Sequence, residues 1–238
     1  MIYKKDPETI APYLRDASNY LEGRADKIVI PESVDELVNF LKFNDLPITI
    51  AGAGTGMTAS RIPESGSILS LEKFQELGDV ENGFIDVGPA VSLIKLTEYL
   101  DSTKYFYPPN PTEMLASIGG TLATNASGSR SFKFGVTRDY VVEADIVLSD
   151  GKMVTIKRGH TINDPLQFSD GYKIYFPQIK YQSPNCKNAA GYYIRPGMDW
   201  LDLFIGSEGT LCIFTRIRLK LRLRAEAFIS GVLFFEKE

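Results

Sequence analysis

The sequence is poor in the residues that build covalent frameworks and metal centres. Its 238 residues include two cysteines, Cys186 and Cys212, and one histidine, His160. A disulfide framework or a zinc site of Cys and His ligands needs more of these side chains, and an iron-sulfur cluster needs about four ligands. The sequence therefore excludes all three kinds of site for this chain alone.

Long apolar runs and an excess of positive charge are also missing. Lysine and arginine number 26 against 30 aspartates and glutamates, which gives a net charge of -4 and no basic surface for nucleic acid. The apolar runs are much shorter than the roughly 20 residues of a membrane-spanning helix, and residues 1–7 do not open a secretory signal. We therefore expect a cytoplasmic protein with no transmembrane segment and no nucleic-acid partner.

The first part of the chain has the pattern of a small α/β lobe. Residues 27–31 are a short apolar run that ends at proline, and residues 47–50 are a second such run, so both predict buried strands. Ser33 is a typical helix N-cap, and apolar residues follow it at helical spacing, at Val34, Leu37, Val38 and Leu41. This is a β-α-β unit. Further elements are expected as strands at 67–71 and 84–88 and as a helix over 92–100.

The later part of the chain has the pattern of an antiparallel lobe. Residues 141–148 and 153–156 are strand-like runs joined by a tight turn. Residues 158–198 are rich in Pro, Gly, Asn and Tyr and predict long irregular connections. Between Arg216 and Arg224 basic and apolar residues alternate, which predicts a strand with one hydrated basic face. Contact of that face with phosphate or an acidic partner is the alternative.

A glycine-rich loop follows the strand at 47–50. Its residues are Ala51, Gly52, Ala53, Gly54, Thr55, Gly56 and Met57. Glycines at alternate positions can present successive backbone N–H groups to a phosphate. A nicotinamide-type loop would need a third glycine where Met57 stands and a helix directly afterwards, although Glu72 lies where a ribose-binding acid would be. That alternative, and a glycine turn that binds nothing, stay open; a Walker loop is excluded because no Lys-Ser/Thr pair follows.

Two further segments, 118–129 and 204–215, have the composition of ligand-binding surfaces. Residues 118–129 are almost all small, so we expect backbone lying against a flat ligand rather than a core helix. Residues 107–112 are a rigid, proline-rich stretch suited to a pocket wall. Residues 204–215 open with a Gly-Ser-Glu-Gly turn that could offer amides to a ligand. A turn-rich surface loop and a buried loop with a capped acid are the respective alternatives.

In this order the three segments resemble the FAD-binding domain shared by vanillyl-alcohol oxidase, p-cresol methylhydroxylase, D-lactate dehydrogenase and the glycolate oxidase flavoprotein subunit. Residues 51–57 resemble the family's pyrophosphate loop, and 118–130 with 134–141 resemble the segment along the flavin. Residues 202–211 resemble the late signature near the adenine side. The resemblance covers roughly residues 25–225.

The resemblance implies an α+β fold of the p-cresol methylhydroxylase (PCMH) type. It has a small N-terminal α/β lobe and a larger lobe with a mainly antiparallel sheet flanked by helices. We expect an N-terminal extension at 1–24, an FAD-binding domain at 25–225 with lobes of about 25–105 and 106–225, and the start of a missing cap domain at 226–238, where 229–236 resemble the first cap strand.

The resemblance and the loop chemistry together imply a set of cofactor-binding residues. They are Ala51, Gly52, Ala53, Gly54, Thr55, Gly56, Met57, Pro108, Thr112, Gly119, Gly120, Ala123, Thr124, Asn125, Ser127, Gly128, Thr137, Glu208, Gly209 and Ile213. Two positions depart from the family. Ala51 stands where relatives often carry arginine, so the amides must bind more of the phosphate, and Cys212 stands where they often carry glycine; a small buried side chain and a reactive thiol are both open there. The matching segments contain no histidine, so non-covalent FAD is expected.

The implied function is that of a flavin-dependent oxidoreductase that takes a hydride from a 2-hydroxy acid or related alcohol onto flavin N5. No residue here is a convincing general base; His160 lies in a polar, turn-prone segment and is expected to have a surface role. The chain is expected to need a cap domain, with a cap-bearing or electron-transfer subunit as partner. A non-catalytic FAD-binding subunit is the alternative, and so are the enolpyruvyl reductase and alkylglycerone-phosphate synthase branches of the same fold.

Overall fold

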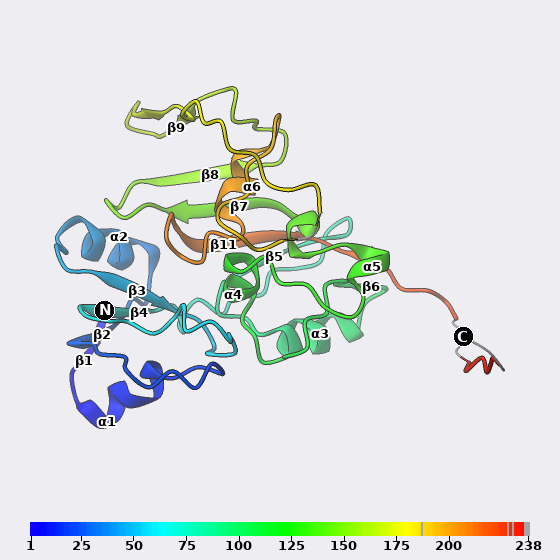
Figure 1. The fold of residues 1–238 in the computed structure, drawn as a ribbon, viewed down its shortest axis with the longest axis horizontal. Coiled ribbons are helices and arrows are strands. Elements are labelled where there is room, and N and C mark those ends of the chain that lie inside the picture. Colours follow the sequence, from blue (N-terminus) through cyan, green and yellow to red (C-terminus); the bar gives the residue numbers. More distant parts are fainter. Residues whose placement is uncertain (187, 228, 230, 236–238) are drawn as a thin grey trace.

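A computed structural model describes residues 1–186, 188–227, 229 and 231–235 (Figure 1). Within these residues the chain forms two four-stranded sheets and two short two-stranded pairs. Figure 1 shows the first sheet beside the second. The α+β class expected from the sequence is confirmed.

The first sheet is mostly parallel. Its order is β1 (Ile2–Lys4), β2 (Lys27–Ile30), β4 (Ser67–Ser70) and β3 (Ile48–Ala51). Strands β2 and β3 both run parallel to β4, which lies between them, while β1 is antiparallel to β2. Parallel strands end at one edge of a sheet, so the connections after β3 and β4 leave the sheet side by side.

Helix α2 (Val34–Lys42) connects β2 to β3 and confirms the predicted β-α-β unit. Ser33 is its N-cap, and its hydroxyl accepts a hydrogen bond of 3.2 Å from the Glu36 amide. Leu37 and Leu41 are buried. The cluster they join includes Val29 and Leu69 of the first sheet and Val147 and Ile213 of the second, so the two sheets share one apolar core.

The N-terminal residues are part of this lobe rather than an extension of it. Strand β1 extends the sheet, and α1 (Pro7–Ile10) is followed by a 3-10 helix, η1 (Ala11–Leu14). Ile10 is buried against Ile28 and Ile68. The expected extension at 1–24 is therefore corrected, because its apolar side chains complete the open side of the first sheet.

The second sheet is antiparallel throughout, as predicted. Its order is β5 (Phe84–Val87), β11 (Ile213–Lys220), β7 (Val141–Val147) and β8 (Met153–Lys157). Because β5 pairs with β11, the division between the two sheets falls between Ser70 and Phe84. That is earlier than the lobe boundary we expected near 105.

Three helices cover the apolar face of the second sheet: α3 (Leu93–Asp101), α4 (Ile118–Ala123) and α6 (Trp200–Phe204). They contribute buried side chains to the main core cluster with strands β5, β7 and β11. The remaining elements are short: β6 (Tyr105–Phe106) pairs with β12 (Arg222–Leu223), β9 (Leu166–Gln167) with β10 (Lys173–Ile174), and α5 (Ser131–Phe134) precedes the 3-10 helix η2 (Thr137–Tyr140). The long irregular connections expected at 158–198 are confirmed; the part around β9 lies beyond β8 in Figure 1, and Tyr192 reaches back to Thr210.

Carboxylates pair with the first two arginines of the predicted basic face, Arg216 and Arg218, whereas Lys220 and Arg222 are exposed to water as expected. Arg216 Nη1 lies 2.7 Å from Asp86 Oδ1, and Arg216 Nε lies 2.7 Å from Asp145 Oδ2. Glu143 pairs with the same guanidinium. Burial acts to raise the pKa of Asp145 and of Glu143, but hydrogen bonds from Arg216 outweigh it and hold both pKa values below their usual range.

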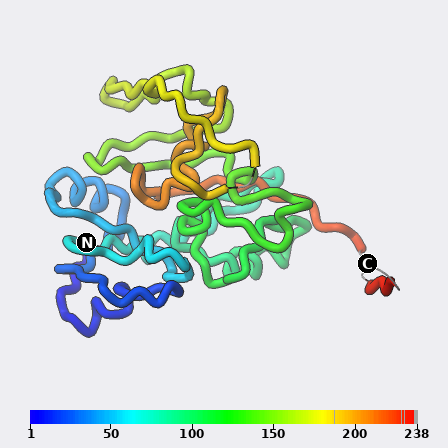
Figure 2. Tube along the Cα trace, in the orientation of Figure 1, coloured from blue at the N-terminus to red at the C-terminus, as the bar shows by residue number. Residues whose placement is uncertain are grey.

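The last described part of the chain runs away from the two sheets (Figure 2). The expected cap strand at 229–236 falls partly on residues outside the described set, namely 230 and 236. Residues 229 and 231–235 are exposed and carry no strand assignment. Among the described residues no helix has the length and apolarity that crossing a bilayer requires.

Candidate cofactor site

The glycine loop leaves the carboxyl end of β3, as predicted. Ala51 is buried in register with Ser70, and Gly54 has a φ of +78°, which a residue with a side chain rarely adopts. None of the amides of residues 53–57 donates a hydrogen bond to the part of the chain that the structure describes. The loop thus carries a row of free N–H groups, the arrangement that binds an anion.

Helix α4 is built from the small-residue segment and corrects our expectation that this segment avoids the core. Ser117 caps it and accepts a 3.2 Å hydrogen bond from the Gly120 amide, while Ile118 and Leu122 are fully buried. An α4 of 6 residues is too short to be stable alone, and each buried side chain contributes about 2 kcal/mol. Ile118 and Leu122 are spaced i, i+4, so both lie on the buried face of the helix and their burial stabilises it. The small residues occupy its other faces.

Two glycines of α4 serve different neighbours. A Cβ added at Gly119 would stand 2.8 Å from Pro89 Cβ, so this glycine permits close packing on the chain before α3. Gly120 lies near the glycine loop. A Cβ added at Gly52 would stand 3.9 Å from the Gly120 Cα and 3.3 Å from Ser117 Oγ. The glycine loop and the start of α4 therefore lie so close together that even an alanine at position 52 would contact Ser117.

The turn at 206–209 joins the same site from the other direction. The Gly206 amide donates to the Leu122 carbonyl at 2.9 Å, and the Glu208 amide donates to the Ala123 carbonyl at 2.8 Å. A Cβ on Gly209 would stand 3.2 Å from Ile50 Cδ1, on β3. Since most of its amides bind protein carbonyls, the turn is mainly a clamp that holds α4 and β3 together; the Gly209 amide has no acceptor among the described residues.

Asn125 and Thr137 connect the end of α4 to η2. Asn125 has a φ of +46°, and its Oδ1 accepts a 3.0 Å hydrogen bond from the Arg138 amide. Thr137 is fully buried, and its hydroxyl donates to the Ala126 carbonyl at 2.8 Å. These contacts fix the loop that follows α4.

Arg138 is a site-building residue that we did not predict. Its buried guanidinium donates to the Ile205 carbonyl, to the Asp202 carbonyl and, at 3.2 Å, to Asp202 Oδ1. The ring of Tyr193 lies 4.2 Å from its Cζ. Burial lowers the pKa of Arg138, and the charge of Asp202 acts in the opposite direction. Arg138 follows Thr137 in segment 134–141, which resembles the family's flavin-binding segment, and this position was the sequence signal that could have identified it.

The expected pocket wall lies against the loop after α4. Tyr107 and Pro108 are buried, while Thr112 is exposed. Gly128 has no room for a side chain because a Cβ would collide with the Asn110 carbonyl. The wall is thus packed on the small-residue segment. Burial raises the pKa of Tyr107, whose hydroxyl has no partner among the described residues.

The remaining candidates are divided between surface and core. Met57 is 79% exposed, and Thr124 is exposed with its hydroxyl bonded to the Gly120 carbonyl at 3.0 Å. Ser127 is half-buried. Ile213 packs in the core shared by the two sheets, so only its backbone is near the turn at 206–209. The structure thus brings together 51–57, 118–125 and 206–209.

The family model for the FAD binding domain matches residues 25–157, more than half of the chain. The chain belongs to this family. The chain is 31% identical over 224 residues to D-lactate dehydrogenase from Archaeoglobus fulgidus, covering 92% of this chain and 42% of that protein. It is 31% identical over 217 residues to glycolate oxidase subunit GlcD from Bacillus subtilis, covering 88% of this chain and 39% of that protein.

A solved structure confirms the fold at lower identity. Alkyldihydroxyacetonephosphate synthase superposes with a TM-score of 0.72 at 18% identity, covering 94% of this chain and 38% of that one. The chain therefore spans about 40% of the length of the relatives it matches. The resemblance and the FAD cofactor inferred from the sequence are confirmed.

The residues present fit FAD. Free amides at 53–57 suit a diphosphate, and the small residues at 119, 120 and 123 allow other groups to approach the backbone of α4 closely. Within the described residues no group of three His, Cys, Asp or Glu side chains could hold a metal ion. Cys212 is buried, and burial raises the pKa of its thiol, which supports the small-hydrophobe reading over a reactive thiol.

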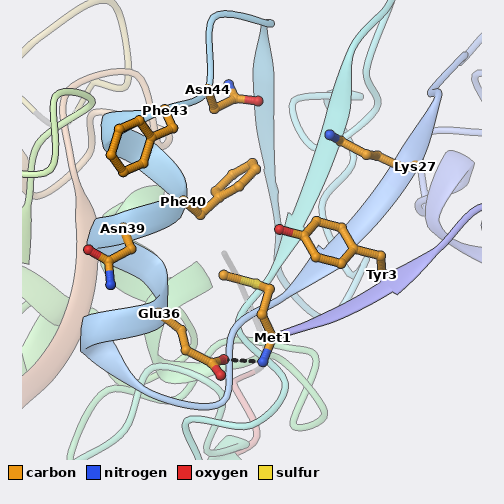
Figure 3. A pocket seen from close by; sticks show the side chains of 8 residues that line it. All are labelled: Met1, Tyr3, Lys27, Glu36, Asn39, Phe40, Phe43 and Asn44. Atoms are coloured by element: carbon orange, nitrogen blue, oxygen red, sulfur yellow. Dashed lines mark ion pairs between the residues drawn. The ribbon is translucent and has the colours of Figure 1, made fainter.

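Two hollows on the surface lie away from these segments. One of about 400 Å³ is lined by aromatic and polar side chains near the N-terminus, where Met1 pairs with Glu36 (Figure 3). Another of about 670 Å³ lies beside residues 20–24 and Glu64. Neither includes a residue of 51–57, 118–125 or 206–209, so backbone geometry rather than hollow volume defines the cofactor site.

Proposed function

We propose that this chain is the cofactor-binding part of a flavin-dependent oxidoreductase that acts on a 2-hydroxy acid or a related alcohol. One observation carries the proposal: a loop of free amides lies in contact with a helix of small residues, in a chain about 31% identical to D-lactate dehydrogenase and glycolate oxidase subunit GlcD. FAD, when bound, accepts a hydride from the substrate carbon at N5. The protein's part is to bind and orient.

The twenty candidate residues are proposed to hold FAD from three sides. Amides of 53–57 would bind the diphosphate, and the exposed side of α4 with residues 123–128 would lie along the flavin. Turn 206–209 would close the site near the adenine. Ile213 would act through its backbone, since its side chain belongs to the core.

FAD is proposed to be bound without a covalent link. The candidate segments hold no histidine, and both Tyr107 and Cys212 are buried, which removes them as exposed nucleophiles. The two cysteines are free, which supports a reducing compartment and hence a cytoplasmic location.

A catalytic base is proposed to come from outside this chain. His160 is half-buried, and its carbonyl accepts the Trp200 amide at 3.0 Å, on the segment that leads into α6. The relatives are more than twice as long, so a cap region of a longer protein or a partner subunit would supply substrate contacts and the base. A non-catalytic FAD-binding subunit is the second candidate. It is favoured by the similarity of this chain to GlcD, which is a subunit of glycolate oxidase.

Two measurements test this function. Denaturing the purified, FAD-reconstituted chain should release unmodified FAD, identified by absorbance and mass; a protein that stays colourless after reconstitution would refute the proposal. D-lactate and glycolate with an artificial electron acceptor should give little turnover with the isolated chain. Steady turnover would show that no cap is needed.

A further inference from the structure

The N-terminal segment 12–18 lies directly against the glycine loop, although the family match begins at residue 25. The Ala17 amide donates to the Gly56 carbonyl at 3.0 Å. A Cβ on Gly54 would stand 3.5 Å from the Arg15 carbonyl oxygen, and a Cβ on Gly56 would stand 4.0 Å from Asp16 Oδ2. The segment therefore forms one wall of the loop.

Arg61 joins this wall to the loop. Its Nη1 donates to the Gly52 carbonyl at 2.9 Å, and its Nη2 donates to the Pro12 carbonyl at 3.1 Å. The Tyr13 ring lies 5.8 Å from its Cζ. The guanidinium fills the space beside Gly54, where a Cβ would collide with it. One side chain thus fixes the carbonyl side of the loop, which leaves the amides to point elsewhere.

The same segment is anchored at the neighbouring strand end. The Tyr13 hydroxyl donates to Glu72 Oε2 at 2.6 Å, and the Ser70 hydroxyl donates to the same oxygen at 3.0 Å. Burial and the bond to Glu72 raise the pKa of Tyr13 to about 12, so this phenol stays protonated as a donor. Glu72 is therefore engaged by the protein, which argues against the ribose-binding role considered for it.

Two buried atoms beside the loop have no hydrogen-bond partner within the described residues: Asp16 Oδ2 and Arg61 Nε. Asp16 Oδ1 is engaged, since it accepts from the Ser18 amide at 2.9 Å. Burial lowers the pKa of Arg61, and the charge of Asp16 acts in the opposite direction. A carboxylate near a diphosphate site repels the ligand, whereas a guanidinium there attracts it.

We infer that Arg61 is a positioning residue for FAD, and that segment 12–18, with Asp16 as an opposing charge, belongs to the diphosphate site. Arg61 holds the Gly52 carbonyl so that the amides of 53–57 stay free, and it supplies the positive charge that Ala51 lacks. This inference rests on the proposed function, because it concerns the same ligand.

The test compares FAD affinity, measured by flavin fluorescence titration of the apoprotein, across matched variants. Arg61→Gln should weaken FAD binding about tenfold or more, the scale of one charge-assisted hydrogen bond. Arg61→Lys keeps the positive charge but cannot bind both carbonyls as the guanidinium does, so its FAD affinity should lie between those of the wild type and Arg61→Gln. Arg24→Gln, the same charge loss at an exposed position of the N-terminal region, should change the dissociation constant by less than about twofold.

Asp16→Asn gives the opposite sign and separates electrostatics from folding. Removing this carboxylate should tighten FAD binding about threefold, because repulsion of the diphosphate falls while the Oδ1 contact to Ser18 is kept. A purely structural role predicts weaker binding in both variants. If Arg61→Gln does not fold, Arg61→Lys and Asp16→Asn still decide the matter.

The outcomes are separable. Unchanged affinity in Arg61→Gln and Arg61→Lys overturns the positioning role, and weaker binding in Asp16→Asn overturns the electrostatic part. If the wild-type chain itself binds no FAD, the proposed function fails before this inference is reached.

Discussion

The two glycine-rich segments at 51–57 and 206–209 resemble each other in composition but differ in what their amides do. In the loop after β3, the amides of 53–57 are free of protein acceptors among the described residues. In the later turn, the amides of Gly206 and Glu208 bind carbonyls of α4. Glycine content therefore does not separate a ligand cradle from a structural clamp, whereas hydrogen-bond partners do.

The largest expected effect breaks the clamp. Arg138→Ala should lower the free energy of unfolding by about 3 kcal/mol, because the carbonyls of Asp202 and Ile205 lose a buried donor, while the Asp202 carboxylate keeps its 2.7 Å ion pair with Arg158. Urea denaturation of the chain measures this. Arg130→Ala, at an exposed neighbour, is the control. A loss of stability below about 1 kcal/mol would show that the turn at 206–209 keeps its conformation without Arg138.

A second pair of variants compares the segments directly. Gly206→Ala should destabilise the apoprotein by about 1–2 kcal/mol, since φ is +88° there and the added Cβ meets Arg138. Gly56→Ala, where the space is open, should leave the melting temperature nearly unchanged and weaken FAD binding. If both variants lowered the apoprotein's melting temperature equally, the distinction between cradle and clamp would be lost.

Two helix caps sharpen the comparison. Ser117→Ala and Ser33→Ala each remove an N-cap hydrogen bond of 3.2 Å and should each cost about 1 kcal/mol in urea denaturation. Only Ser117 also lies beside the glycine loop, where a Cβ added at Gly52 would stand 3.3 Å from its Oγ. FAD titration should therefore show weaker binding in Ser117→Ala but not in Ser33→Ala. Equal FAD affinities of the two variants would show that α4 is not part of the cofactor site.

The smallest effect concerns the outer face of the second sheet, which carries no residue of either segment. The pKa values of Glu143 and Asp145 are lowered on folding, so their contribution is present above the unfolded values of about 4 and is lost as pH falls through the folded values. Melting temperature should therefore drop below about pH 4. Arg216→Met should flatten this drop; an unchanged pH profile would contradict the assignment to these pairs.

Short-range patterns were sufficient for most elements. The strands β2, β3, β7 and β8 and the helices α2 and α3 follow from period and caps, because these depend on neighbours within one turn. The glycine loop was also placed correctly after β3. The family resemblance then supplied the cofactor, which no single loop specifies.

Long-range contacts decided the rest. Arg61 reaches Pro12 across 49 residues, and Arg138 reaches Ile205 across 67. Strand β5 joins the second sheet because β11, far along the chain, pairs with it. α4 is a helix despite its small residues because Ile118 and Leu122 find a core to enter.

The amino-acid order thus determined local geometry and the glycine loop, since both are encoded in residues close together, and the order of three separate segments indicated the class of cofactor. The tertiary structure alone decided which amides stay free and which side chains brace them. A hydrogen bond needs its acceptor within about 3 Å, and the acceptors here come from segments that meet only when the chain is folded.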